Sequence, residues 1–202
     1  MSVSGIPAKR GRPRSESAKA AILAAAASIL RELGLREMTI DTVAARAGVS
    51  KATIYRWWDS KAELALDTML AEALHLLPLP DTGSLAGDVR ARARATVRAF
   101  RSPTLGPVFA SLIGEAQADP DFAIAFRDRV IRPLRDASRE IFKRAIARGE
   151  VAEDVPVEVA LDLLVSPAYY RLLLRTGPLD VRFADQVADL LLTGLRPKPP
   201  PT

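Results

Sequence analysis

Residues 50 to 58, SKATIYRWW, contain side chains that can recognise both the charge and the hydrogen-bonding groups of a polymer. At 100° per residue, a helix over this segment would point Ile54 and Trp58 to one side. The opposite side and its flanks would carry Ala52, Thr53, Tyr55, Arg56 and Trp57. Arginine can form paired hydrogen bonds with guanine, the Ala and Thr methyl groups can pack against thymine, and hydroxyl groups can bond phosphates. This face is therefore suited to the major groove of DNA.

Lys61 is a second candidate for binding a nucleic-acid backbone. It lies in the first turn of a predicted helix, where the helix dipole disfavours a cation by a few tenths to about 1 kcal/mol. Together with the free N–H groups of that turn, its ammonium could hold a phosphate. The alternative is a solvent-exposed lysine that costs little, and for Lys61 taken alone that alternative is preferred.

These side chains belong to two short helices joined by a glycine turn. Thr39 can cap a helix over residues 40–47 that ends at Gly48, and Ser50 can cap the next one over residues 51–58. Two short capped helices joined in this way form the helix-turn-helix, which presents its second helix to the DNA major groove. An ordinary helical hairpin is the alternative interpretation.

The rest of the chain also shows the apolar spacing of helices, and no segment shows the sustained alternation of a strand. We therefore predict an all-α fold with a kink at Pro133, inside the seventh helix. The nine predicted helices cover residues 15–34, 40–47, 51–58, 60–77, 84–101, 104–118, 120–148, 157–174 and 183–195.

Charge and composition narrow the function further. Residues 1–61 carry a net charge of +6 and the remaining residues −1, which indicates a polyanionic partner at one end of the chain. The absence of cysteine and the single histidine exclude thiolate, disulfide and multi-histidine metal sites, and we expect no cofactor. No apolar run is long enough to cross a bilayer and the N-terminus lacks a signal-peptide core, so we expect a cytoplasmic protein.

The N-terminal stretch KRGRPR places three arginines, Arg10, Arg12 and Arg14, just before the first predicted helix. Its Arg-Gly-Arg-Pro core resembles the AT-hook, in which extended arginines lie in the narrow minor groove of A·T-rich DNA. That groove has an enhanced negative potential that attracts arginine. Two interpretations stay open: the arm either reads the minor groove or adds sequence-independent attraction to DNA.

Residues 15–61 resemble the DNA-binding domain of the TetR family of transcriptional regulators, and the similarity extends more loosely over nearly the whole chain. The matching residues are Gly34, Thr39, Val43, Ala44, Ala47, Gly48, Val49, Ser50, Thr53, Ile54, Tyr55, Trp58, Lys61, Glu63 and Leu64. The resemblance implies that the helix over 51–58 enters the major groove, and that Thr39, Thr42, Thr53, Tyr55 and Lys61 meet the DNA backbone. Ser50 and Lys51, at the start of that helix, complete the predicted DNA-binding set. Trp57 departs from the family's commoner choices, so packing on phosphate and support of the core both remain open.

The resemblance also implies a homodimer that pairs through its last two helices, represses transcription from a palindromic operator, and leaves DNA when a small molecule binds the second domain. We accordingly expect a disordered basic arm (1–14), a helix-turn-helix domain (15–61), an effector-binding and dimerisation domain (62–196) and a disordered tail (197–202). The predicted operator is double-stranded DNA with half-sites about one helical turn apart, or further apart if two dimers bind.

The effector pocket is harder to predict, because an apolar stripe is what any helical bundle needs for its core. The sequence shows no cluster of buried charge, which favours an apolar or aromatic effector. The candidate lining residues are Met69, Leu70, Leu74, Phe109, Leu112, Phe126, Leu134, Tyr169 and Tyr170. Two other functions remain: an architectural DNA-binding protein that responds to no ligand, and, remotely, a helical-bundle enzyme. The enzyme is disfavoured because the second domain offers no Ser-His-acid set and no glycine-rich phosphate loop.

Overall fold

The computed structural model describes residues 12–103 and 105–195, with side chains described from residue 16 onward. Every regular element in these ranges is helical, which confirms the predicted all-α fold. Arg10 and the C-terminal tail lie outside the described residues. The chain divides into two compact units between Thr68 and Met69, and each unit is described by itself. None of the described helices is long and apolar enough to span a membrane.

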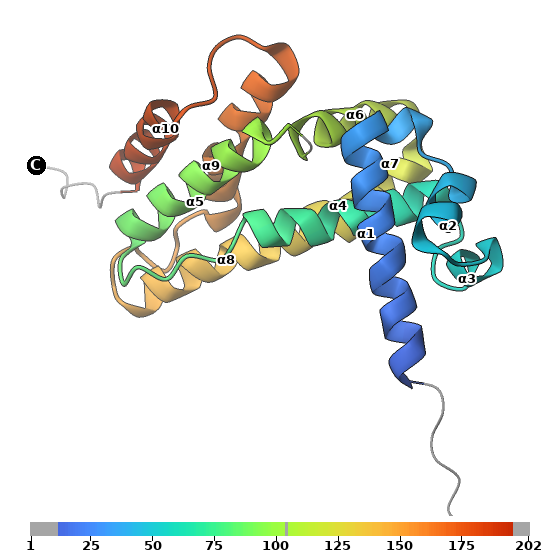
Figure 1. Ribbon diagram of the computed structural model, residues 1–202. Helices are drawn as coiled ribbons and strands as arrows, with labels where there is room; N and C mark the ends of the chain where they lie inside the picture. The colour runs from blue at the N-terminus through green and yellow to red at the C-terminus, as the bar shows by residue number, and fades with distance from the viewer. Residues whose placement is uncertain (1–11, 104, 196–202) are drawn as a thin grey trace, which may run out of the picture. The chain divides into compact units, whose positions relative to one another are not determined.

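The first unit contains α1 (Arg12–Glu37), α2 (Ile40–Ala47), α3 (Lys51–Tyr55) and the first half of α4 (Lys61–Leu76) (Figure 1). Helix α1 begins three residues earlier than predicted. Gly34, with φ 79° and ψ 175°, breaks the helical geometry where the sequence predicted an end. Within this unit, α1 packs against α2, and α2 packs against α3.

Local sequence signals account for the bounds of α2. Thr39 caps it, Thr42 completes a reciprocal capping box, and Gly48 ends it in the left-handed conformation with φ 66°. Met38 and Val43, the apolar residues on either side of the cap, occupy the positions of a hydrophobic staple and are both buried. Both ends of α2 fall where the sequence predicts them.

Helix α3 is shorter than predicted. It ends at Tyr55 rather than Trp58, and the backbone N–H groups of Trp57 and Trp58 both donate to the carbonyl of Ile54, at 2.9 and 3.1 Å. The last turn therefore tightens as helix ends commonly do. A helix of five residues has too few internal hydrogen bonds to be stable alone, so its stability depends on packing within the unit.

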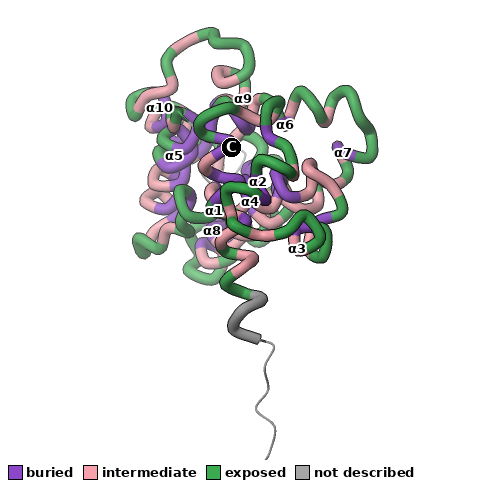
Figure 2. The backbone as a smooth tube through the Cα atoms, turned by 45° about the vertical axis from the view of Figure 1, so that its right-hand side comes forward, coloured by how far each residue is buried: buried purple, intermediate pink, exposed green. Residues whose placement is uncertain are grey.

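The second unit is a helical bundle built around α5. Helix α10 lies alongside α5 in Figure 1, and α5 also contacts α6, α8 and α9. Most of α5 is buried, as Figure 2 shows. Its elements after α4 are α5 (Leu85–Arg101), α6 (Leu105–Ala118), α7 (Pro120–Phe126), the π-helix η1 (Arg127–Ile131), α8 (Arg132–Ala147), α9 (Val157–Leu174) and α10 (Val181–Gly194).

The predicted seventh helix is present as the continuous run of α7, η1 and α8. The expected irregularity falls immediately before Pro133, as a π-helical turn over Arg127–Ile131. Proline lacks an N–H and its ring clashes with the carbonyl four residues earlier, here that of Arg129. A widened turn at this point is the kind of local adjustment that accommodates a proline within a helix.

Candidate DNA-binding surface and ligand cavity

The predicted inner and outer sides of α3 agree with the structure. Ile54 and Trp58 are buried, whereas Ala52, Tyr55 and Arg56 are exposed, Tyr55 to 50%. The two residues predicted to lie at the sides, Thr53 and Trp57, have intermediate exposure. The turn after Tyr55 still places Arg56 outward and Trp58 inward, so the prediction holds although the helix itself is shorter.

Two contacts hold this surface in place. At its start, the Ser50 hydroxyl accepts a hydrogen bond from the Thr53 N–H at 3.2 Å, and the two hydroxyls lie 2.9 Å apart. At its end, the Trp58 indole N–H donates to the Asp67 carboxylate at 2.8 Å. Both Ser50 and Thr53 retain hydrogen-bonding capacity, because a hydroxyl has one donor and two acceptor sites.

The front of α2 presents two further hydroxyls. The Thr39 hydroxyl accepts from the Thr42 N–H at 3.1 Å, and the Thr42 hydroxyl accepts from the Thr39 N–H at 3.0 Å. Both residues are exposed. Their first role is thus to cap α2, and that role leaves them at the surface beside the helix N-terminus, where anions are favoured.

Lys51 and Lys61 both have protein partners that sequence analysis did not predict. The Lys51 ammonium pairs with the Asp41 carboxylate, and this hydrogen bond raises the pKa of Lys51. The Lys61 ammonium donates to the carbonyl oxygens of Leu35 and Arg36, at 3.3 and 3.4 Å. Lys61 therefore binds the C-terminal end of α1, where the helix dipole favours a cation.

The three arginines of the N-terminal arm cannot be placed on this surface. Arg10 precedes the described residues. Arg12 and Arg14 belong to the first turn of α1, and their side chains lie outside the described part of the chain.

The second unit contains a partly open cavity of about 200 Å³, which we call the α5 cavity. Side chains from the end of α4 and from α5, α6, η1, α8 and α9 line it. Three of the predicted residues, Phe109, Leu134 and Tyr169, are among them. The other six are not: Met69, Leu112 and Phe126 are buried in the core, Leu70 is half-buried, and Leu74 and Tyr170 are exposed.

Three aromatic rings form one wall of the α5 cavity. The ring centroid of Phe100 lies 5.4 Å from that of Phe109 and 5.0 Å from that of Tyr169, and those of Phe109 and Tyr169 lie 5.5 Å apart. Such edge-to-face and tilted arrangements are the favoured geometry of aromatic pairs. Burial raises the pKa of Tyr169 to about 12, against the opposing effect of nearby Arg92 and Arg135. The Tyr169 hydroxyl therefore stays protonated at neutral pH.

The sequence shows no cluster of buried charge in the second domain, and the structure differs from that expectation. Helix α5 buries Asp88 and Arg92, and Arg92, only 3% exposed, lines the α5 cavity. The sequence contained a signal for Arg92: at 100° per residue it lies 60° from Val89, within the apolar face of α5. This signal is easily missed, because Arg90, Arg94 and Arg98 recur every four residues and suggest that the arginines of α5 share one polar face. Arg135, Ser138 and Thr96 are other polar lining residues that sequence analysis missed.

Comparison with known proteins accounts for this combination of surface and cavity. A sequence model described as "Bacterial regulatory proteins, tetR family" matches residues 22–68, and one described as "Tetracyclin repressor-like, C-terminal domain" matches residues 79–191. The chain belongs to the TetR family. It is a helix-turn-helix transcriptional regulator, as the sequence resemblance implied.

Individual TetR-family relatives cover most of the chain. An uncharacterised helix-turn-helix regulator of Bacillus subtilis, YdeS, is 42% identical over 166 residues, which are 82% of this chain and 83% of that protein. The DNA-binding transcriptional repressor TetR of Mycobacteroides abscessus is 36% identical over 91% of this chain and 97% of its own length. The crystal structure of the TetR family regulator SCO0332 has a TM-score of 0.81 and 35% identity, covering 90% of this chain and all of that one.

Proposed function

We propose that this TetR-family protein is a dimeric repressor that binds a pseudo-palindromic operator through α3 and is released from it by a small molecule in the α5 cavity. The observation that carries the proposal is the two-sided α3 segment, with Ala52, Tyr55 and Arg56 exposed over a buried Ile54 and Trp58. An arginine, a phenol and a methyl group on one exposed face match the base edges and phosphates of a major groove.

The surrounding residues would fix the register of α3 on DNA. We propose that Thr39, Thr42, Ser50, Thr53 and Tyr55 bind phosphates through their hydroxyls. The same proposal gives Lys51 and Lys61 one phosphate each, and gives Trp57 a packing role beside the backbone. The Lys51 charge is shared with Asp41, so its contribution should be the smaller of the two.

The last two helices supply the proposed dimer interface. They expose an unusual number of large apolar side chains, Leu190 to 76%. These residues are Val159, Leu163, Tyr170, Leu173 and Leu174 on α9, and Val181 and Leu190 on α10. A large apolar surface of this kind favours association, because burying it recovers about 25 cal/mol per Å². Pairing with a second copy would form a symmetric interface, as in most homodimers.

Release from DNA requires that the ligand and the operator favour different conformations of the dimer. A ligand that weakens operator binding by some factor must itself bind more weakly, by the same factor, to the DNA complex. Helix α4 contributes its first half to one unit and its second half to the other, and its final turn reaches the α5 cavity through Ala73. We propose that α4 carries this coupling, that the protein acts in the cytoplasm, and that it is not an enzyme.

The experiment is to select fragments of the host's DNA that the full-length protein retains, and then to measure their affinity. Tyr55→Phe and Arg56→Ala should weaken binding to the selected operator, with Arg56→Ala also relaxing specificity at one base pair by about 1–3 kcal/mol. Arg36→Ala is the matched control, because Arg36 is an exposed arginine of the same unit outside α3. Equal affinity for selected and random DNA would contradict the proposal and favour the architectural alternative.

A further inference from the structure

The charged groups that line the α5 cavity do not balance. The lining contains two arginines, Arg92 and Arg135, and one carboxylate, Asp162. The two arginines differ in their partners, which decides which of them is free to bind a ligand.

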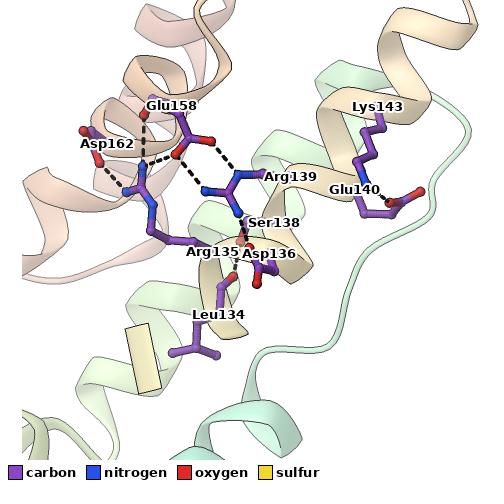
Figure 3. Close-up of polar contacts among 9 residues, drawn as sticks. All are labelled: Leu134, Arg135, Asp136, Ser138, Arg139, Glu140, Lys143, Glu158 and Asp162. Carbon is purple, nitrogen blue, oxygen red and sulfur yellow. Dashed lines mark hydrogen bonds and ion pairs between the residues drawn. The ribbon is translucent and has the colours of Figure 1, made fainter. Parts of the chain in front are cut away.

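Arg135 is neutralised by the protein. Figure 3 shows its guanidinium reaching from α8 to Asp162 and Glu158 on α9, with the bond to the Glu158 carboxylate at 2.7 Å. Arg139 binds the same Glu158, so two arginines of α8 and two carboxylates of α9 share one network across the two helices. These hydrogen bonds raise the pKa of Arg135. Arg135 is therefore engaged in joining α8 to α9.

Arg92 has no carboxylate partner of this kind in the part of the chain that the structure describes. One terminal nitrogen donates to the Leu77 carbonyl at 3.1 Å, and its Nε finds no acceptor among the described residues. The buried carboxylate one helical turn earlier, Asp88, instead accepts hydrogen bonds from Thr82 and Arg144. Burial lowers the pKa of Arg92, yet a guanidinium remains charged in proteins.

A buried charge without a counter-charge is costly, and an anion brought beside it removes much of that cost. An arginine fork also matches a carboxylate geometrically, with paired and parallel hydrogen bonds. The protonated Tyr169 hydroxyl, which also lines the cavity, is suited to donate a further hydrogen bond. The other two rings of the aromatic wall, Phe100 and Phe109, favour an apolar or aromatic body.

The size of the cavity limits that body. Apolar cavities of roughly 150 Å³ in other proteins hold a benzene molecule. The α5 cavity, at about 200 Å³, is larger by about the volume of a small substituent. One ring with one carboxylate fits this space, whereas a fused multi-ring ligand would extend beyond it.

From these features, and resting on the ligand response in the proposed function, we propose that the effector is a small organic monoanion, a carboxylate on a single-ring apolar body, with its carboxylate bound by Arg92. This assignment adds a negative charge to the apolar or aromatic effector expected from the sequence. Arg92 is then the specificity-determining residue of the α5 cavity.

The test compares acids with their neutral amides on the full-length protein. Benzoate, phenylacetate and cyclohexanecarboxylate are paired with benzamide, phenylacetamide and cyclohexanecarboxamide, and binding is measured by calorimetry and by the shift in melting temperature. At least one acid should bind tenfold or more tightly than its amide. An amide that binds as well as its acid in every pair, or no acid that stabilises the protein at millimolar concentration, would overturn the proposal.

Variants then locate the anion site. Arg92→Met should abolish the preference for the acid while changing amide affinity less than twofold, and Arg98→Met should keep the wild-type preference. Arg98 is the matched control because it is an exposed arginine on the same helix. Retention of the acid preference by Arg92→Met would refute the role of Arg92. Should that variant fail to fold, the acid and amide comparison on the wild type still decides the ligand class.

Operator binding separates this inference from the proposed function. Arg92→Met should retain wild-type affinity for the selected operator in the absence of acid, and the acid should no longer release it. Specific DNA binding without any acid preference would leave the repressor proposal intact and reject the carboxylate. Absence of specific DNA binding by the wild type would instead reject the repressor.

Discussion

Lys61 offers a direct test of how one residue can serve both the fold and the operator. Its ammonium has three N–H donors, and the carbonyls of Leu35 and Arg36 take two of them. The third donor has no acceptor among the described residues and is available to a phosphate. We therefore predict that Lys61→Met, which keeps a straight side chain and removes the charge, lowers both stability and DNA affinity.

The two losses have different sizes and different signatures. The bonds to the α1 carbonyls are long, at 3.3 and 3.4 Å, so we take the low end for a charged donor and a helix C-terminus, about 1 kcal/mol. For a chain of this length, that corresponds to a fall in melting temperature of about 2–4 °C. Loss of one phosphate contact per subunit should reduce the slope of log affinity against log salt by about 0.9 per subunit, or about 1.8 per dimer.

The measurements are a calorimetric melt and a salt series of operator binding followed by fluorescence anisotropy. Lys143→Met is the control, because Lys143 is an exposed lysine in the second unit that pairs only with the neighbouring Glu140 among the described residues. It should change neither quantity appreciably. A lower melting temperature with an unchanged salt slope would show that Lys61 is only a cap for α1 and would refute its contact with phosphate.

Three other predictions concern Trp58, the exposed apolar side chains of α9 and α10, and Glu158. Trp58→Phe removes the indole hydrogen bond to Asp67 and should lower the free energy of unfolding by about 2 kcal/mol in a denaturant titration. It should also weaken operator binding, because this bond holds the end of the α3 segment in place. Unchanged stability would contradict this prediction. Combining Leu174→Arg with Leu190→Arg should give monomers in analytical ultracentrifugation, and a persistent dimer would place the interface elsewhere. Two arginine hydrogen bonds lower the pKa of Glu158 from 4.5 to about 2, so the stability that the ionised carboxylate gives the fold is complete above pH 4.5 and lost toward pH 2. Glu158→Gln should therefore reduce the pH dependence of the free energy of unfolding between these two values. An unaltered pH dependence would count against the network.

The parts of the fold that the sequence predicts well are those determined by neighbouring residues. Thr39 and Gly48 specify both ends of α2 because a cap and a left-handed glycine act within one turn of chain. The start of α10 was placed two residues late, since the true cap, Asp180, comes before the first apolar residue of the expected stripe. The π-helical turn before Pro133 depends on how a whole helix accommodates a ring, and periodicity does not encode that choice.

The candidate sites divide in the same way. The exposed face of α3 could be predicted because one buried residue, Ile54, sets the angle of all its neighbours. The α5 cavity could not be predicted, because it depends on which faces of its lining helices meet, and that is a property of the packed bundle. Tyr169 and Tyr170 illustrate the difference: they are adjacent in sequence, yet one lines the cavity and the other is exposed.

Helix α5 carries arginines with two different roles: some pair with carboxylates of the protein, and one faces the α5 cavity. Arg90 and Arg94 lie at its surface and pair with Asp189 and Asp185 of α10, at 2.8 and 2.6 Å. Arg92, between them in sequence, turns about 200° from each and enters the core instead. The two surface arginines have carboxylate partners within the chain, and the inner one has none among the described residues. An apolar residue at position 92 would stabilise the fold more than a buried arginine that has no counter-charge among the described residues. Packing alone therefore does not explain Arg92, and its charge points to a ligand.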